Sequence, residues 1–182
     1  MKKVIDLAVI AMLTVIVFTV EQALAFIPNI QLTVLLFIVY TKIVGFKKTM
    51  VIILLHTMAD NLYNGSLNPF IFIPMLLAWS MIPVLLSTVF RKFDSPLFMM
   101  VFAFLFGFIY GMSFIPFASY QFGINIRAYF IADLPFEALM ALSGAVSVGL
   151  FYTPLMTFLK EQPVLQKDSY LMKRYSPPTK SL

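Results

Sequence analysis

Long apolar runs, separated by short polar or proline-containing breaks, dominate the pattern along this chain of 182 residues. A helix that crosses a membrane needs about 20 mostly apolar residues, within a range of roughly 17–25. The pattern predicts six such helices, over residues 4–26, 30–44, 48–63, 70–90, 96–117 and 126–159. The second and third runs are short for a full span, which is tolerated where the backbone is shielded from lipid.

Composition supports a chain surrounded by lipid. Hydrophobic residues make up 61% of the chain and the mean hydropathy is +0.94, whereas soluble domains average about 45–50% apolar residues. We therefore predict an all-α integral membrane protein, with residues 1–160 forming one transmembrane domain and residues 161–182 a polar cytoplasmic tail. The length leaves no room for a separate soluble domain.

The basic residues predict the orientation. If the N-terminus is cytoplasmic, twelve of the thirteen Lys and Arg residues fall on the cytoplasmic side and Arg127 alone lies outside. Positive charge is enriched in cytoplasmic loops of membrane proteins. We therefore predict six spans with both termini in the cytoplasm, and we interpret the net charge of +5 as basic loops rather than a nucleic-acid surface.

The sequence lacks the residues that several classes of protein require. The chain has no cysteine and one histidine, so a zinc-ligand set is not expected. No Gly-rich Walker-type phosphate loop is present, so the chain has no ATPase motif of that kind. No nucleophile–histidine pattern stands out either. We predict a non-enzymatic chain without cofactor or metal, although acid–base chemistry by Asp60 and Glu137 stays a distant alternative.

The stretch over residues 56–69 is conspicuously polar for its surroundings. Polar side chains at membrane depth are costly and usually face a bundle interior or a water-filled cavity. On the predicted topology, polar and aromatic groups gather at the outer ends of the helices, which favours a solute site open to the exterior. The predicted substrate-binding residues are Asn29, Gln31, Asp60, Asn61, Asn64, Trp79, Tyr110, Tyr129, Asp133 and Glu137.

Simpler structural interpretations stay open for several of these residues. Asp133 and Glu137 are four residues apart and share a helix face, where an ion pair with Arg127 is the alternative to a binding wall. Trp79 lies near the middle of its predicted helix, where core packing is the simpler interpretation. His56 is the deepest residue of the polar stretch, and we expect it to be structural.

Taken together, the chain resembles the S components, the substrate-binding membrane subunits of energy-coupling factor (ECF) vitamin importers. The resemblance covers roughly residues 1–160. It is carried by the six predicted spans, the polar end of the third span, and two sequence segments. These segments are Phe-Ile-Pro-Asn-Ile-Gln-Leu over residues 26–32 and Asp-Leu-Pro-Phe-Glu over residues 133–137.

The resemblance implies a function and partners. It implies capture of a vitamin at the outer face of a bacterial cell membrane, and docking on a membrane coupling subunit that carries two cytoplasmic ATPases. Cobalamin is the first choice of vitamin and pantothenate the second. A small membrane assembly subunit without a ligand is the alternative from another class.

Small residues suggest where such a partner docks. Ala8 and Ala11 lie on the first predicted helix, although the family often has Ala-x-x-x-Ala there and this chain matches that spacing only in part. Ala141 and Ala145 lie on the last predicted helix, where small residues allow close approach of helix backbones. Packing within the chain is the other explanation for this second pair.

Overall fold

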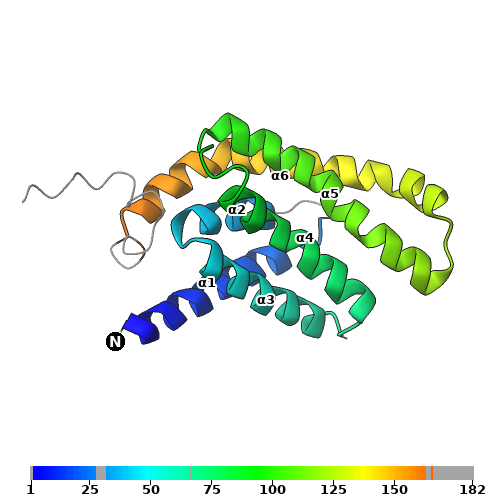
Figure 1. Cartoon of the computed structure of the whole chain (residues 1–182), viewed down its shortest axis with the longest axis horizontal. Helices are drawn as coiled ribbons and strands as arrows, with labels where there is room; N and C mark the ends of the chain where they lie inside the picture. Colours follow the sequence, from blue (N-terminus) through cyan, green and yellow to red (C-terminus); the bar gives the residue numbers. More distant parts are fainter. Residues whose placement is uncertain (1, 28–31, 66, 163–164, 166–182) are drawn as a thin grey trace, which may run out of the picture.

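The computed structural model describes residues 2–27, 32–65, 67–162 and 165, and these form an all-helical fold (Figure 1). The six helices are α1 (Lys2–Leu24), α2 (Thr33–Ile43), α3 (Phe46–Tyr63), α4 (Pro69–Ser87), α5 (Pro96–Phe122) and α6 (Ile126–Lys160). No strand occurs among the described residues. The six helices match the six that the sequence predicts. Asn29, Gln31 and most of the predicted tail lie outside the described residues.

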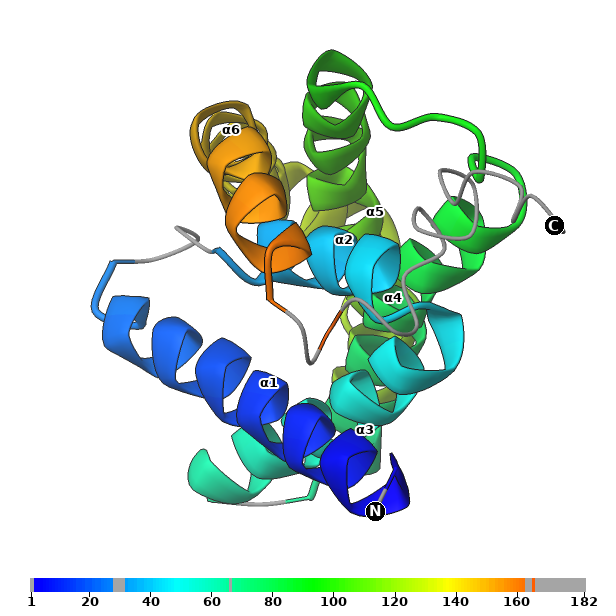
Figure 2. The ribbon, with the colours of Figure 1, turned by 90° about the vertical axis from the view of Figure 1, so that its left-hand side faces the viewer.

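The short helix α2 forms the centre of the fold. All eleven of its residues are buried, and it contacts each of the other five helices. Figure 2 shows α2 between α1 on one side and α6 on the other. At 1.5 Å per residue a helix of this length covers about 16 Å, about half of a hydrocarbon core. Because its neighbours shield it from lipid, its short length exposes no backbone.

Helices α5 and α6 form a long antiparallel hairpin held by small residues. Gly107 lies so close to Ala141 that an added Cβ would overlap the Ala141 backbone, and Gly144 approaches Ala103. Such contacts bring helix backbones together, which is how helices associate in lipid. α5 continues through Pro116 to Phe122, five residues beyond the predicted end, and α6 runs unbroken through Pro135 and Pro154.

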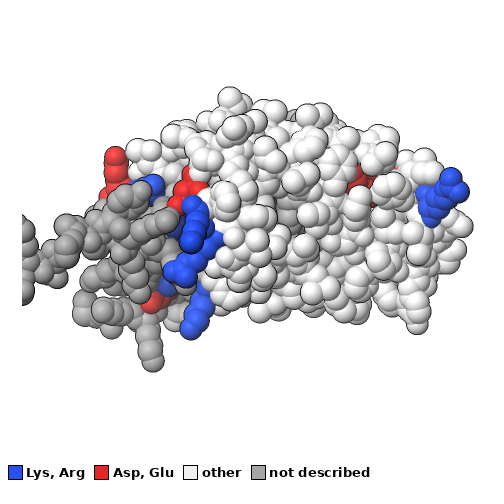
Figure 3. All heavy atoms as spheres, turned by 45° about the horizontal axis from the view of Figure 1, so that its top comes forward, with Lys and Arg blue, Asp and Glu red and all other residues white. Residues whose placement is uncertain are grey.

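Four helices, α1, α4, α5 and α6, are long and apolar enough to cross a membrane. α2 is too short to meet the same criterion, and α3 is not among the four. Figure 3 shows charged side chains towards the two ends of the described surface, with a wide uncharged stretch between them. These features suggest a protein embedded in a membrane.

The two ends differ in chemistry. The basic end contains the start of α1, the α2–α3 turn, the α4–α5 loop and the end of α6, where Lys42 pairs with Asp94 and Lys48 with Asp6. The polar end contains the end of α1, the starts of α2 and α4, the end of α3 and the α5–α6 turn (Figure 1). The candidate site lies toward the polar end.

Candidate functional site at the polar end

A partly buried carboxylate, that of Glu21, joins α1 to its neighbours at the polar end. The Thr33 hydroxyl at the start of α2 donates a hydrogen bond to Glu21 Oε2 over 2.8 Å. The same oxygen lies 3.0 Å from Nε2 of His56, whose side chain is completely buried in α3. Glu21 therefore connects three helices through one carboxylate.

A second set of polar contacts lies beside the first. Gln22 Nε2 on α1 donates to Asp60 Oδ1 on α3 over 2.8 Å, and Asn64 Nδ2 reaches the same oxygen at 3.1 Å. Because residues four apart share a helix face, His56, Asp60 and Asn64 follow one line along α3 and meet the last turns of α1. Helix periodicity thus builds one polar wall of the site.

Asn61 and Thr57 belong to the neighbouring line of α3 and point into the protein. Asn61 is 4% exposed, and its Nδ2 donates to the Thr57 backbone carbonyl over 2.9 Å and lies 3.5 Å from Met75 Sδ on α4. The Thr57 side chain is completely buried, and its hydroxyl has no hydrogen-bond partner among the described residues. These side chains extend the polar wall towards α4.

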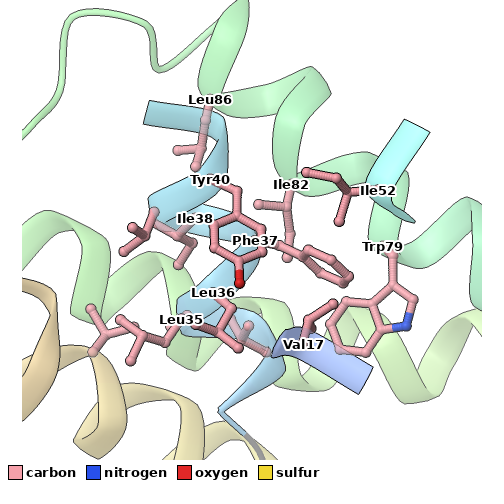
Figure 4. Close-up of a cluster of buried hydrophobic side chains, with 14 of the residues drawn as sticks. Val17, Leu35, Leu36, Phe37, Ile38, Tyr40, Ile52, Trp79, Ile82 and Leu86 are labelled. Carbon is pink, nitrogen blue, oxygen red and sulfur yellow. The ribbon is translucent and has the colours of Figure 1, made fainter. Parts of the chain in front are cut away.

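An aromatic group covers the inner side of this wall. The Phe37 ring of α2 contacts His56 edge-on at 5.5 Å and Trp79 at 5.2 Å between ring centroids. Trp79 in turn contacts Phe106 at 5.6 Å and Tyr110 at 4.5 Å. Figure 4 shows Phe37 and Trp79 beside the aliphatic side chains of the core. Trp79 thus packs in the core, as the simpler interpretation of the sequence holds, and also adjoins Tyr110 on the polar side.

Helices α5 and α6 supply a further acidic group. The Glu137 carboxylate lies against Gly111, in space that a Cβ at this position would fill. Asp133 lies one turn earlier on the same face of α6, with its carboxyl group beside that of Glu137. Tyr110 lies within electrostatic range of Glu21, Asp60 and Glu137. Carboxylates from α1, α3 and α6 therefore all contribute to the electrostatic environment of Tyr110.

Some buried polar atoms in this region have no hydrogen-bond partner among the described residues. They are Oγ1 of Thr57, Nε1 of Trp79, Oε2 of Glu137 and both ring nitrogens of His56. Nε2 of His56 lies 3.0 Å from Glu21 Oε2 but does not have the geometry of a hydrogen bond to it. Buried polar groups in folded proteins nearly always have partners, and one left without a partner costs about 1–3 kcal/mol. Each of these groups can therefore form at least one further hydrogen bond.

The structure brings some predicted site residues together and separates others. Asp60, Trp79, Tyr110 and Glu137 belong to one connected region through the contacts above. Tyr129 lies within electrostatic range of Asp133 and Glu137, further towards the α5–α6 turn. Asn64 is exposed and caps the end of α3 by donating to the Asp60 backbone carbonyl.

The ion pair between Arg127 and the α6 carboxylates, which the sequence offers as an alternative, is not among the ion pairs of the described residues. Arg127 is exposed near the start of α6, and the ion pairs among the described residues include none between Arg127 and Asp133 or Glu137. The ion pairs of the described residues therefore give Asp133 and Glu137 no Lys or Arg partner. This arrangement favours the binding-wall interpretation of the pair over the ion-pair interpretation.

The predicted docking residues differ in accessibility. Ala8 and Ala11 are exposed on α1. Ala145 is partly buried. Ala141 is completely buried against Gly107, so packing within the chain explains this residue and it offers no surface to a partner.

Sequence reasoning left several site residues out of the predicted set. Glu21 and Gln22 are polar residues near the end of the first predicted helix, where solvation at the membrane interface explains them equally well. Thr33 and Thr57 gave no signal, because a threonine in an apolar helix commonly bonds to its own backbone. Only the packing of α1 and α2 on α3 reveals these contributions.

A separate apolar groove lies elsewhere in the molecule. It has a volume of about 370 Å³ between α1, α2 and α6, and its described lining consists of apolar side chains such as Val20, Leu35, Phe151 and Leu155. It offers a ligand no polar side chain for recognition. The polar end is therefore the better candidate for a specific solute site.

Neither metal chemistry nor known relatives narrow the function further. The described residues include no group of three or more His, Asp or Glu side chains placed to hold a metal ion. Comparisons with protein-family models, curated proteins and solved structures found no match. The proposal below therefore rests on residues and geometry.

Proposed function

We propose that this chain is a substrate-binding S component of an ECF-type importer. In this role it captures a vitamin at the outer face of a bacterial cell membrane and delivers it together with an ATPase-driven coupling module. The observation that carries the proposal is the polar cluster among α1, α2 and α3, with Trp79, Tyr110 and Glu137 adjoining it. A small-molecule site has this general form, an apolar pocket with a few placed polar groups.

The topology needed for this role is six spans with both termini in the cytoplasm. The paired lysines Lys42 and Lys48 lie at the basic end, and positive charge is retained on the cytoplasmic side. The polar end is then outside. α2 and α3 complete the six spans as helices packed against the four longer ones.

In this proposal, α1 docks on the coupling subunit. α1 contacts α3 and α2 but leaves much of its surface uncovered, including Ala8 and Ala11. Small residues on an exposed helix face allow a partner helix to approach closely. The chain supplies recognition, and two partner ATPases supply energy.

The choice of vitamin rests on the resemblance and on the general chemistry of the side chains. Cobalamin is the first choice, because a large neutral amphipathic ligand suits amide and aromatic side chains. Pantothenate is the second choice. The test is to purify the full chain from cells supplied with a vitamin mixture and to identify the bound molecule by mass spectrometry.

This experiment has one outcome that supports the proposal and one that contradicts it. A vitamin bound at stoichiometric level, together with co-purification of a membrane subunit and two ATPases, is the expected result. If the purified chain binds no vitamin at micromolar concentration, with or without its coupling module, the proposal is wrong.

A non-catalytic assembly subunit is the second candidate, favoured by one specific observation. Glu21, Asp60 and Thr33 already have hydrogen-bond partners within the chain, as side chains that only hold helices together would. Alanine substitution of Asp60, Asn61 and Asp133 distinguishes the two. Loss of vitamin uptake with normal folding favours the S component, whereas loss of folding without an uptake defect of its own favours the assembly subunit.

A further inference from the structure

The single histidine of the chain lies against a carboxylate where α1, α2 and α3 meet. The His56 side chain is completely buried, and its Nε2 lies 3.0 Å from Oε2 of Glu21. The same oxygen accepts the hydrogen bond from Thr33. Histidine is the side chain whose charge most readily changes between about pH 5 and 8. The contact therefore places a titratable group at the point where α1 is held by its neighbours.

This contact requires a proton. A carboxylate oxygen carries only lone pairs, and a neutral imidazole has one N–H donor and one acceptor nitrogen. Without a proton, Nε2 of His56 and Oε2 of Glu21 would face each other as two electron-rich atoms at 3.0 Å. Since imidazole is a stronger base than a carboxylate, the proton belongs on Nε2.

The other ring nitrogen, Nδ1, decides whether the ring is neutral or charged. It has no hydrogen-bond partner among the described residues. A donor facing Nδ1 would hold the ring neutral, and an acceptor facing it would hold the ring charged. Because the part of the chain that the structure describes supplies neither, the charges nearby decide how readily Nδ1 takes up a proton.

The titratable groups around His56 are acidic. Glu21 faces the ring from α1, and Asp60, one turn further along α3, lies within electrostatic range of both. Tyr110 of α5 lies within range of these two carboxylates and of Glu137 on α6. Negative charge on these groups favours a positively charged ring.

The other two helices in contact with α3 add no basic group at this point. α4 contains no titratable residue. The titratable residues of α2 are Tyr40, whose hydroxyl donates to the Leu13 carbonyl, and Lys42, which pairs with Asp94 at the basic end. Burial opposes a charged ring, so the carboxylate in contact with the ring controls the balance.

We propose that Glu21 and His56 form a proton-binding pair, and that proton uptake by His56 holds α1 more tightly on α3. A neutral ring makes one polar contact with the carboxylate, whereas a charged ring makes an ion pair with it. Because the folded chain then binds the proton more tightly than the unfolded chain does, this stabilisation is present at acidic pH and is lost as the pH rises.

The inference rests on the proposed function in one respect, namely that the polar end faces outward and that α1 docks on the coupling subunit. On that basis the proton comes from outside the cell and acts on the docking helix. The chemistry of the pair itself does not depend on the importer role, so the two can be tested separately.

The single histidine makes the test direct. The full chain is labelled with ¹⁵N in the histidine ring only and reconstituted in lipid nanodiscs. NMR shifts of the two ring nitrogens, which distinguish both neutral tautomers from the charged ring, are followed between about pH 5 and 8. We expect the charged ring at the acidic end of this range and the tautomer with its proton on Nε2 at the alkaline end.

Variants then test the role of the carboxylate. Glu21→Gln keeps an acceptor oxygen for Thr33 but removes the charge next to the ring, and it should weaken proton binding by His56 about tenfold or more. Asp60→Asn should have a smaller effect, because its Oδ1 already accepts hydrogen bonds from two amide side chains. Glu161→Gln is the matched control, since it removes an exposed carboxylate at the basic end, and it should change nothing.

A double-mutant cycle tests the link to α1. Unfolding by SDS titration is compared for the parent chain, Glu21→Gln, His56→Gln and the double variant at both ends of the pH range. The stabilisation that the two residues share, expressed as a factor in the equilibrium constant for unfolding, should be severalfold larger at the acidic end. If either variant does not fold, the tautomer and the titration of the parent chain decide.

Any of four results overturns the inference. They are a ring that stays neutral at the acidic end, a neutral ring with its proton on Nδ1, proton binding that Glu21→Gln leaves unchanged, and a shared stabilisation that does not vary with pH. A chain that captures a vitamin but shows one of these results retains the proposed function and loses the proton-binding pair. A chain with the expected titration that binds no vitamin and no coupling module retains the pair and loses the importer role.

Discussion

The basic end and the polar end carry comparable numbers of acidic side chains but treat them differently. At the basic end, Lys42 lies 2.7 Å from Asp94 and Lys48 lies 2.8 Å from Asp6, and these two carboxylates are 32% and 45% exposed. At the polar end, the Glu21 side chain is 16% exposed and lies 3.0 Å from the ring of His56, which is fully buried. The basic end satisfies its charges with lysine and water, as an anchor at a membrane surface does.

The difference shows which end is specialised. At the basic end, Lys42 and Lys48 pair with Asp94 and Asp6 within the chain. At the polar end, buried atoms of His56, Thr57, Trp79 and Glu137 lack partners among the described residues. Unmet polar groups cost stability, so their retention at one end only points to a role there beyond holding helices together.

The largest effect on stability is expected from Trp79→Ala. The side chain is completely buried and contacts Phe37, Phe106 and Tyr110. Loss of a buried aromatic side chain costs about 3–5 kcal/mol. Unfolding by SDS titration in mixed micelles measures the loss, with Trp79→Phe as the control that keeps a ring and should cost less. Equal stability of Trp79→Ala and the parent chain would show that the indole is not part of the packed core.

Glu21→Leu should have the next largest effect. The change removes the acceptor of the Thr33 hydroxyl and the neighbour of His56, leaving buried polar groups without a partner. The expected loss in free energy of unfolding is about 1–3 kcal/mol. Glu21→Gln, which keeps an acceptor oxygen for Thr33, should lose less. If both substitutions cost the same, the hydrogen bond from Thr33 is not what stabilises this junction.

Gly111→Val tests whether Glu137 needs the space beside α5. An added side chain would overlap the Glu137 carboxylate, so the carboxylate must leave its position. We expect overpacking to cost about 1–3 kcal/mol and ligand binding to fall.

Gly149→Ala is the matched control for Gly111→Val. Its Cβ would meet only the side chain of Met100, and a thioether side chain is flexible enough to move. Ligand binding should be unchanged in this control. Equal binding by Gly111→Val and the parent chain would remove Glu137 from the site.

The smallest effect is expected from Lys48→Gln at the basic end. Lys48 and Asp6 are 20% and 45% exposed, and an exposed ion pair contributes about 0.2–1 kcal/mol. The free energy of unfolding should change by no more than this amount, and ligand binding should not change. If Lys48→Gln lowers the free energy of unfolding as much as Glu21→Leu does, the ion pair at the basic end stabilises the fold as strongly as the Glu21 contacts at the polar end. That result would contradict the contrast between the two ends.

The sequence was sufficient for the helices and for the alignment of several candidate residues along them. The apolar runs and their breaks predict six helices, because a long apolar run in lipid must satisfy its backbone as a helix. Spacing alone places Asp133 and Glu137 on one face of α6. The same rule aligns His56, Asp60 and Asn64 on α3, and the structure has all of these residues on helices.

The remainder depends on how the helices pack. The apolar sequence of α2 does not show that the other five helices surround it, because a helix that faces lipid and a helix that faces protein have the same apolar pattern. The contact between Glu21 and His56 joins residues far apart in the chain, and no local pattern encodes it. The separation of Ala141, which is buried, from Ala8 and Ala11, which are exposed, likewise follows only from the packing of α5 on α6.

The most direct test of the account is native mass spectrometry of the full chain purified from cells supplied with a vitamin mixture. The parent chain is compared with an Asp60→Ala, Asn61→Ala double variant whose folding is confirmed by thermal unfolding. The account predicts one small molecule bound per parent chain and loss of that molecule from the folded variant. A parent chain that carries no small molecule, or a folded variant that carries the same molecule at the same occupancy, would contradict it.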